Sequence, residues 1–315
     1  MDQNNYIEAK LAELDKVLSE KKRIKALFPD QRARDKAIAY IDVETQDEVC
    51  LTMKTGEDIT RGLLGTFALT LGVLFSVVAY YNNTGSTVGY FATFIFFFTF
   101  FFLAPLLWDL FSPMPHPVIF NRRTQEVYAH FKGELYHIRW DRARAITYED
   151  QLVTQYTGLS KFGYLEILLQ SYHEPDKWIW VNLSMPLGRT VEMQCGLWEY
   201  LRAYMNNGPW FDVNGNHSVS DTYNQEQLSA SRDTTRERLR EARDDIREDD
   251  PTSKYSYYLM LILSPLNFIR EAFYAFALKR SVRAWPKEVQ DRLKPNGPTT
   301  SLTELQEAKQ SAVVS

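Results

Sequence analysis

Cysteine and histidine are scarce in this chain of 315 residues, which has two cysteines and five histidines. No group of Cys and His residues has the spacing of zinc ligands, so a structural zinc site has no support, and no other cofactor is expected. Cys50 and Cys195 lie on segments that we place on the cytoplasmic side of a membrane, where thiols stay reduced. A disulfide between them is therefore not expected.

Motifs of common catalytic sites are also missing. The sequence has no Gly-rich phosphate loop and no Gly-x-Ser-x-Gly nucleophile. Asp141 and the pair Glu149 and Asp150 are the candidate acids and bases, but no His or Lys stands near them at the spacing of a dyad. We therefore expect a protein that is not an enzyme.

A strong charge of either sign is absent as well. The formal net charge of −4 gives no basic field over the whole chain, so nucleic acid is not an expected partner. The mean hydropathy of −0.34 indicates that most of the chain is polar and soluble.

Charge is missing completely from two long runs, residues 63–81 (LLGTFALTLGVLFSVVAYY) and residues 88–108 (VGYFATFIFFFTFFFLAPLLW). As helices, each would be about 30 Å long, which matches the hydrocarbon core of a bilayer. Backbone groups in lipid must bond within their own segment, so such runs are helical. Residues 82–87 between them suffice only for a turn. The runs predict a hairpin of two transmembrane helices, and the alternative is a buried helical hairpin of a soluble protein.

The positions of the basic residues predict the orientation of this hairpin. Lys54 and Arg61 precede the first run, Arg122 and Arg123 follow the second, and the turn has no Lys or Arg. The positive-inside rule therefore places both termini in the cytoplasm. The membrane-interface residues would then be Tyr80 and Tyr81 on the outer side and Trp108 on the inner side.

After the second run the pattern becomes that of short strands followed by a helix. Pro113, Pro115 and Pro117 predict an extended exit from the membrane. The expected strands are residues 118–121, 126–131, 134–140, 144–148, 164–172 and 177–183, and the expected helix is 190–205. Antiparallel strands closed by one helix predict a cytoplasmic pleckstrin-homology-like β-barrel or sandwich over residues 113–210.

The N-terminal part, residues 1–61, is expected to be cytoplasmic and to hold a helix and short strands. Ile7, Leu11, Leu14 and Leu18 follow the spacing of one helix face within residues 5–26. That face either docks on the membrane or a partner, or packs on the protein's own domain. Residues 37–53 predict one or two strands.

The remaining C-terminal segments are expected to be helical and then flexible. Residues 211–254 form a charged connector that we expect to be a solvated helical arm. Residues 255–278 are apolar but interrupted by Pro265, so they predict an interfacial helix whose Arg280 and Arg283 face anionic lipid. Packing of residues 255–294 on the rest of the protein is the alternative. Residues 295–315 should be a flexible tail or a weakly held helix.

Basic residues in the predicted loops are the candidates for binding a headgroup or a partner. Arg122 and Arg123 fall in the first hairpin of the β domain, Lys132 falls in the second, and Lys161 lies in a later loop. In a barrel of this type such turns can bind an anionic headgroup. The alternative is that these residues follow the membrane segment and only fix its orientation.

Three stretches of the sequence resemble a known family. Residues 117–128 read PVIFNRRTQEVY, Trp140 and Asp141 follow, and residues 284–289 read AWPKEV. This pattern resembles an uncharacterised bacterial family, the domain of unknown function 6708, over residues 40–290. Its members are often encoded beside type VI secretion effectors. The resemblance implies a role in antagonism between bacteria and a place in the inner membrane, and it implies no catalytic residue.

The sequence thus predicts an α+β membrane protein, with a two-helix transmembrane hairpin, a cytoplasmic β domain and additional helices. Its expected partners are membrane lipids and a protein. The favoured function is that of an inner-membrane immunity protein that binds and neutralises a secreted toxin. The alternatives are a membrane-tethered adaptor or chaperone for effector delivery, and a lipid-sensing pleckstrin-homology-like module.

Overall fold

The computed structural model describes residues 9, 11–13, 16, 24–39, 42–55, 62–81, 98, 102–154, 158–186, 188–208, 234–246, 251–280 and 284–314. The chain forms two compact units. The first unit comprises Met1–Ile59, Pro115–Ser231 and Ala284–Ser315, and the second comprises Thr60–Met114 and Arg232–Arg283. Each unit is therefore assembled from segments that are far apart in the chain.

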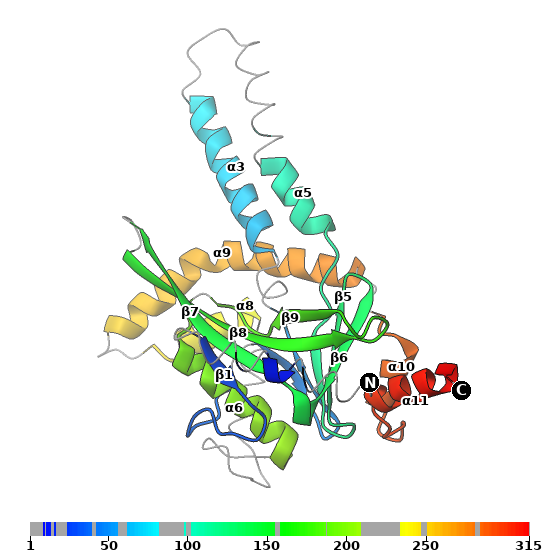
Figure 1. Cartoon of the computed structure of the whole chain (residues 1–315). Helices are drawn as coiled ribbons and strands as arrows, with labels where there is room; N and C mark the ends of the chain where they lie inside the picture. The colour runs from blue at the N-terminus through cyan, green and yellow to red at the C-terminus, as the bar shows by residue number, and fades with distance from the viewer. Residues whose placement is uncertain are drawn as a thin grey trace. The chain divides into compact units, whose positions relative to one another are not determined.

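A curled antiparallel sheet of nine strands forms the centre of the first unit (Figure 1). Its order is β1-β7-β8-β6-β5-β4-β3-β2, and β9 also pairs with β8. The strands are β1 (Ile24–Leu27), β2 (Val43–Gln46), β3 (Cys50–Met53), β4 (Val118–Asn121), β5 (Glu126–Phe131), β6 (Glu134–Arg139), β7 (Ala145–Thr154), β8 (Gly158–Ser171) and β9 (Trp178–Asn182). The long strands β7 and β8 pair with each other; β7 also pairs with β1, and β8 also pairs with β6 and β9.

Side chains in the central strands alternate between the two faces of the sheet, as the pleat requires. Phe120, Val127 and Ala129 enter an apolar core on one face. Ile119 and Tyr128, which lie between them in sequence, enter a second core on the other face. Both faces of the sheet are therefore covered.

Helix α6 (Val191–Asn207) covers the first face. Thr190 begins it, since its side-chain oxygen accepts a hydrogen bond of 3.3 Å from the backbone N–H of Met193. Trp198 and Tyr204 on this helix are completely buried. Burial of such large aromatic rings makes α6 an integral part of this core.

Two short helices, α10 (Lys287–Leu293) and α11 (Leu302–Val314), pack on the second face. Val289 of α10 and Leu302 of α11 are completely buried there. Of the two alternatives predicted for residues 295–315, a flexible tail or a weakly held helix, the structure has the helix, α11. Polar contacts from the sheet, described below, hold its start.

The strands predicted from the sequence are present. The bounds of β4 and β5 agree with the prediction, whereas β7 extends beyond residue 148 and β8 begins before residue 164. The predicted N-terminal helix of residues 5–26 lies mostly outside the described residues, and its last part is wrong, because Ile24–Leu27 is strand β1 paired with β7. Leu11 is buried against Leu168, which favours packing on the protein's own domain at this position.

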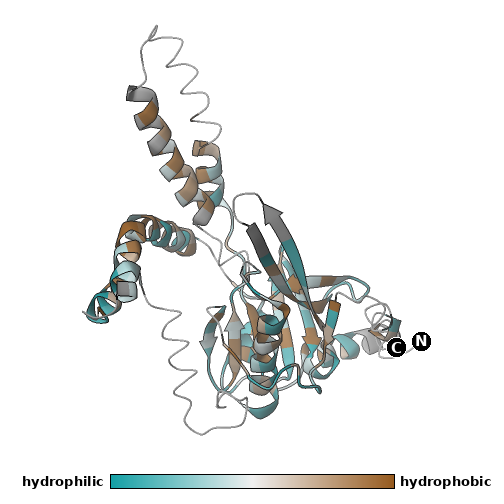
Figure 2. Cartoon of the chain, turned by 90° about the vertical axis from the view of Figure 1, so that its left-hand side faces the viewer, coloured by the Kyte–Doolittle hydropathy of each residue, from teal (hydrophilic) through white to brown (hydrophobic). Residues whose placement is uncertain are grey.

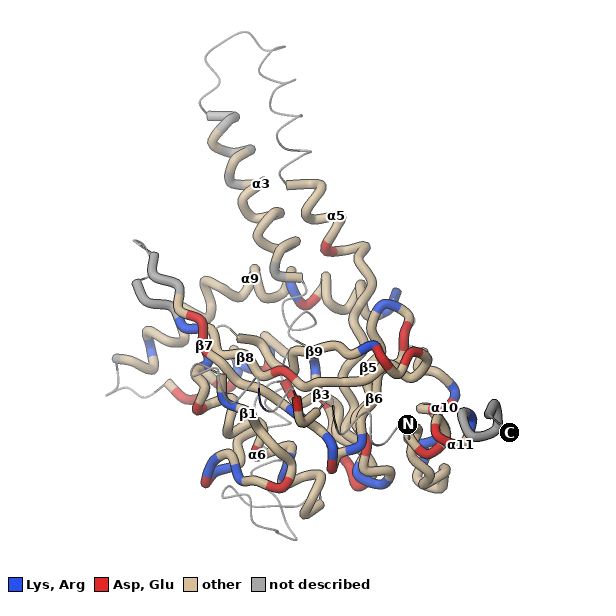
Figure 3. The backbone as a smooth tube through the Cα atoms, viewed as in Figure 1, with Lys and Arg blue, Asp and Glu red and all other residues tan. Residues whose placement is uncertain are grey.

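The second unit consists of apolar helices and one charged helix. Helix α3 (Leu63–Tyr81) coincides with the first predicted span, and α5 (Ala104–Phe111) corresponds to the end of the second. Most of that second span, including residues 88–97, lies outside the described residues. Figure 2 shows α3 and α5 as mostly apolar, and Figure 3 shows no charged residue along α3.

Close helix packing holds α3 against α5. A Cβ atom added at Gly65 would lie 3.3 Å from Leu106 Cδ1, and one added at Gly72 would lie 3.0 Å from Phe98 Cε2. The carboxylate of Asp109 in α5 accepts a hydrogen bond of 2.7 Å from the backbone N–H of Gly65. Asp109 thereby satisfies one of the free N–H groups at the start of α3.

Helix α9 (Pro251–Arg280) is continuous through Pro265, so the expected break in this segment is wrong. Proline cannot donate the hydrogen bond that the Leu261 carbonyl would accept. The hydroxyl of Ser264 donates to that carbonyl instead, at 2.8 Å. The backbone group is satisfied, and the helix continues.

Among the described residues, Thr252–Arg280 is the one helix that is long and apolar enough to cross a membrane. Within the same residues, the first predicted span contains only a shorter apolar helix, Leu64–Val73, by this criterion of length and composition. The structure therefore gives one membrane-length helix rather than the two of the predicted hairpin. It lies in a segment predicted to be interfacial.

The charged connector is not a free arm where the structure describes it. Helix α8 (Thr235–Asp244) begins with a capping box formed by Thr234 and Glu237. Glu271 of α9 accepts a hydrogen bond of 2.7 Å from the backbone N–H of Thr235. The connector is therefore tied to α9 at the start of α8.

Candidate partner-binding cleft

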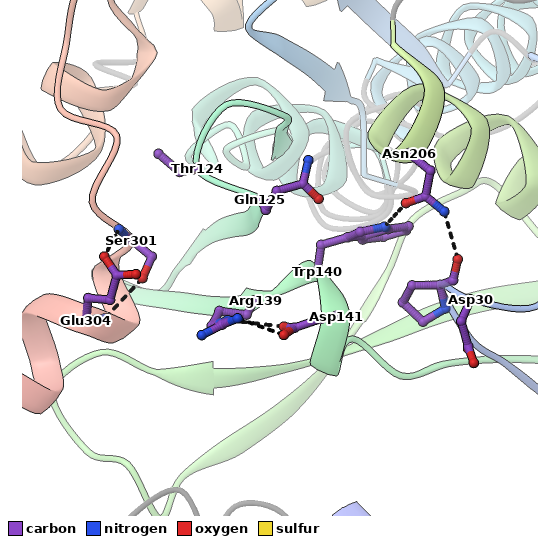
Figure 4. A pocket seen from close by; sticks show the side chains of 10 residues that line it. Asp30, Thr124, Gln125, Arg139, Trp140, Asp141, Asn206, Ser301 and Glu304 are labelled. Atoms are coloured by element: carbon purple, nitrogen blue, oxygen red, sulfur yellow. Dashed lines mark hydrogen bonds and ion pairs between the residues drawn. The ribbon is translucent and has the colours of Figure 1, made fainter. Parts of the chain in front are cut away.

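An open cleft of about 430 Å³ lies in the first unit, where five separate parts of the chain meet. The β4–β5 turn, the end of β6, the end of α6 and the start of α11 form it together with the loop after β1. Its lining residues are Pro29, Asp30, Thr124, Gln125, Arg139, Trp140, Asp141, Asn206, Ser301 and Glu304. Figure 4 shows them from close by, with Trp140 between the acidic side chains.

Trp140 is the central residue of this cleft. Its backbone N–H donates to the carbonyl of Gln125 at 2.8 Å, and its indole Nε1 donates to Asn206 Oδ1 at 2.7 Å. Asn206 donates in turn to the carbonyl of Pro29 at 2.9 Å. The indole also packs 5.2 Å from the ring of Trp198, so the floor of the cleft is rigid.

The rim of the cleft is more acidic than basic. Asp30, Asp141 and Glu304 contribute three carboxylates, and Arg139 contributes one guanidinium group. Arg139 binds both oxygens of Asp141, at 3.1 and 2.7 Å. The candidate acid Asp141 is therefore held by a bidentate pair, in which a carboxylate acts as an acceptor.

The other acidic candidates lie elsewhere on the sheet. Glu149 of β7 faces Lys161 of β8, 3.4 Å from its ammonium group, and accepts a hydrogen bond from Gln151. Those two contacts, with Gln151 first, hold the pKa of Glu149 below its usual value. Glu149 and Lys161 thus form a cross-strand pair on an exposed part of the sheet.

The basic residues predicted to bind a headgroup are not brought together. Arg122 and Arg123 lie in the turn before β5, whereas Lys132 lies in the turn after it. Six residues of strand separate the two turns, which is about 20 Å. Lys161 lies on β8 rather than in a loop. These four residues therefore do not form one site, and their role in binding a headgroup or a partner stays a prediction.

Two of these arginines have structural partners. Arg122 donates to the carbonyl of Glu48 at 3.3 and 3.2 Å. Arg123 donates to the carbonyl of Arg292 at 2.7 Å and also to the carbonyl of Pro295. Asn121 bonds to the same Arg292 carbonyl at 3.1 Å. The Asn-Arg-Arg turn thus fixes the end of α10.

The predicted membrane-interface residues belong to the second unit. Trp108 is 72% exposed. Arg280 donates to the carbonyl of Phe111 at 2.7 Å, and its guanidinium group lies over the Phe111 ring. The side chains of Tyr80 and Tyr81, and Arg283 altogether, lie outside the described residues.

A buried polar cluster behind the cleft was not predicted. Glu126 of β5 is completely buried and accepts hydrogen bonds from the backbone N–H groups of Leu302 and Thr303, at 2.7 and 3.0 Å. Tyr128 donates to it at 2.9 Å, and His137 Nδ1 lies 3.5 Å away. The carboxylate thus caps α11, which forms one wall of the cleft.

Several influences determine the pKa of Glu126. Burial acts to raise it, but the contacts with His137 and with the N–H groups of Leu302 and Thr303 outweigh burial and lower it. Glu126 is therefore a carboxylate at neutral pH. One signal for the cluster was in the sequence, since Glu126 begins a strand that is mostly apolar. The N–H groups of Leu302 and Thr303 that it binds, however, follow it by 176 and 177 residues.

A family model described as "Family of unknown function (DUF6708)" matches residues 95–294 of the chain. The chain belongs to this family. Neither the curated proteins nor the solved structures include a match. The resemblance seen in the sequence is therefore confirmed, although the matched part of the chain begins well after residue 40.

The DUF6708 match includes parts of both units, namely α5, α9 and the sheet from β4 to β9. The residues on which the resemblance depended meet in the first unit. Gln125 of the Asn-Arg-Arg-Thr-Gln turn and Trp140 of the Trp-Asp pair are hydrogen bonded to each other in the cleft. Two of the three stretches that carried the resemblance thus line this cleft.

Proposed function

We propose that this protein is a membrane-anchored binding protein that neutralises an antibacterial effector at the bacterial inner membrane. The observation that carries the membrane part is the outer surface of α3. Phe67 and Val73 on this charge-free helix are 60% and 56% exposed within the structure. Large apolar side chains facing outward on a helix of this length suit a lipid environment.

The proposed anchor is a hairpin of two spans, residues 63–81 and 88–108, with both termini in the cytoplasm. Its support is the packing of α3 against α5, in which Phe75 and Phe102 have ring centroids 6.1 Å apart. Small residues at such contacts, here Gly65 and Gly72, let membrane helices approach closely. The basic residues outside the runs support the orientation.

The proposed cytoplasmic part is the first unit, which we assign to a pleckstrin-homology-like architecture. A curled antiparallel sheet with α6 on one face is compatible with that class. The cleft around Trp140 is the surface that we propose for the effector. Its excess of carboxylates favours a basic segment of the partner.

The role in immunity depends on the neighbourhood that the DUF6708 resemblance implies, beside type VI secretion effectors. Confinement to the inner membrane raises the concentration of an inhibitor at the place where a membrane-active toxin must act. No covalent chemistry is needed for such a role, since binding alone blocks the toxin.

The test is survival of sensitive cells that are exposed to the effector encoded beside this gene. Cells with the full chain should survive, whereas cells with Asp30→Arg and Glu304→Arg in the cleft should die. A matched control is Asp150→Arg, at an exposed position of β7 away from the cleft, which should still protect. If the full chain does not protect, but its deletion in the attacker abolishes delivery of the effector, the protein is an adaptor and the proposal is wrong.

A further inference from the structure

Helix α9 crosses the base of the helical hairpin rather than running beside it. Figures 1 and 2 both show α9 below the ends of α3 and α5, across their direction. All these helices belong to the second unit. Since α9 has the length and composition of a membrane span, its direction determines whether it crosses the bilayer or lies on it.

Three contacts fix this direction. The Arg270 carbonyl lies 2.9 Å from where a Cβ of Gly62 would be, just before α3, and Phe273 Cδ2 lies 3.2 Å from where a Cβ of Gly65 would be. Ten residues after Arg270, Arg280 bonds to the carbonyl of Phe111 at the end of α5. Ten helical residues extend about 15 Å, enough to pass from the base of one helix to the base of the next.

The α9 surface remains apolar beyond these contacts. Ile262 is 72% exposed, and Leu259, Leu261 and Phe268 are also exposed. The helix ends with the exposed basic residues Lys279 and Arg280. Exposed apolar side chains suit contact with lipid, and basic residues at the end of the helix suit anionic headgroups.

We propose that α9 lies in the plane of the cytoplasmic leaflet and binds its anionic lipid surface, as a helical base from which α3 and α5 enter the bilayer. This inference depends on the hairpin of the proposed function. A helix of 30 residues is about 45 Å long, which exceeds the thickness of the hydrocarbon core. A helix that lies in the plane of the membrane is not limited by that thickness. Arg270 and Glu271 then remain at the headgroups instead of inside the bilayer.

The first experiment labels single cysteines in the full chain with a maleimide that does not cross membranes. Thr252→Cys and Lys279→Cys report the two ends of α9, and Ser86→Cys reports the turn of the hairpin. The native thiols interfere little, because Cys195 is buried, and burial with the nearby Asp47 carboxylate raises the pKa of Cys50 to about 12.

In intact cells, only Ser86→Cys should react, and both ends of α9 should react after the membrane is opened. Reaction of one α9 end in intact cells would make α9 a third span and overturn the proposal while leaving the hairpin in place. If Ser86→Cys reacts only after opening, the hairpin itself fails, and the in-plane position of α9 fails with it.

The second experiment measures depth with a fluorophore on Ile262→Cys, in proteoliposomes that contain anionic phospholipid. A nitroxide near the headgroup should quench the dye about twofold more strongly than one at the end of the acyl chain, because interfacial helices sit shallowly. Stronger quenching by the deep nitroxide would indicate a span. No quenching by either would place α9 in water, and both results contradict the proposal.

Discussion

Two tryptophans illustrate how the two units differ. Trp198 of α6 is completely buried between the helix and the sheet, whereas Trp108 of α5 is 72% exposed. The first unit turns its large side chains inward and covers both faces of its sheet. The second turns Phe67, Val73 and Ile262 outward. The exposed apolar side chains of the second unit are those that the proposed function places in lipid.

In both units, nevertheless, a carboxylate side chain accepts hydrogen bonds from the N–H groups at the start of a helix. Glu126 receives the first N–H groups of α11 in the sheet unit, and Asp109 receives those of α3 in the helical unit. Free backbone N–H groups are costly in lipid and in a protein interior alike. A buried carboxylate accepts these hydrogen bonds in both units, and the side chains around it differ.

Replacement of the two tryptophans should give the largest difference between the units in the free energy of unfolding. Trp198→Ala should lower the free energy of unfolding by about 3–5 kcal/mol, because it leaves a large cavity in a packed core. Trp108→Ala should change it by less than about 0.5 kcal/mol in detergent, because that ring has few protein contacts to lose. Chemical denaturation of the two variants provides the comparison, and equal losses would contradict it.

A charged residue introduced at an exposed apolar position should affect the second unit more than the first. Val73→Asp places a charge near the middle of α3 and should cost about 2.5–3.5 kcal/mol of membrane insertion. The protein should then be extracted from membranes by alkaline carbonate. Phe131→Asp, at the partly exposed end of β5, is the matched control and should remain in the membrane fraction.

Loss of the Glu126 carboxylate should release α11. Glu126→Gln should lower the free energy of unfolding by about 1.5–3 kcal/mol, because it weakens hydrogen bonds to a charged acceptor. Protease cleavage between α10 and α11 should become faster. Asp244→Asn, at the exposed pair with Arg243, should change neither, since exposed pairs contribute about 0–1 kcal/mol.

The same carboxylate predicts a dependence on pH. The folded-state pKa of Glu126 is below its ordinary value of 4.5, so the unfolded chain binds the proton more readily. The stability due to Glu126 is therefore complete above that ordinary value and is lost as the pH falls through the lower folded-state pKa. Denaturation of Glu126→Gln should show a weaker acid dependence than that of the wild type.

The smallest effects are expected for two helix caps. Thr190→Ala removes the cap of α6, and Thr234→Ala removes that of α8, and each should cost about 1 kcal/mol. In α6 this cost should reduce the stability of the whole first unit. In α8 it should appear only as faster hydrogen exchange of the first turn, because few apolar residues bury that helix. Equal exchange in both helices would contradict the comparison.

The sequence predicted most of the sheet because its signals are local. Turn residues such as Lys132 and Gly133 and the period-two pattern of β5 lie within a few residues of each other. The continuity of α9 was missed because Pro265 is normally a helix breaker. The hydroxyl of Ser264 replaces the missing donor, and no rule of residue spacing predicts that.

The cleft could be predicted only in part. Gln125 and Trp140 were recognised in the sequence, but their hydrogen bond and their partner Asn206 depend on the fold of the curled sheet and of α6. The four basic candidates were chosen because they fall in predicted loops of the β domain. A six-residue strand nevertheless places Arg123 and Lys132 at opposite ends. Proximity along the chain does not determine proximity across a sheet.

The contrast between the units can be measured directly by labelling the full chain in native membranes with a carbene probe dissolved in the lipid. Mass spectrometry then locates the labelled residues. The account predicts labels on residues 63–81, on α5 and on residues 259–278, and none on residues 118–207. Labels absent from residues 63–81, or spread evenly over both units, would contradict the claim that the helical unit lies in lipid and the sheet unit in water.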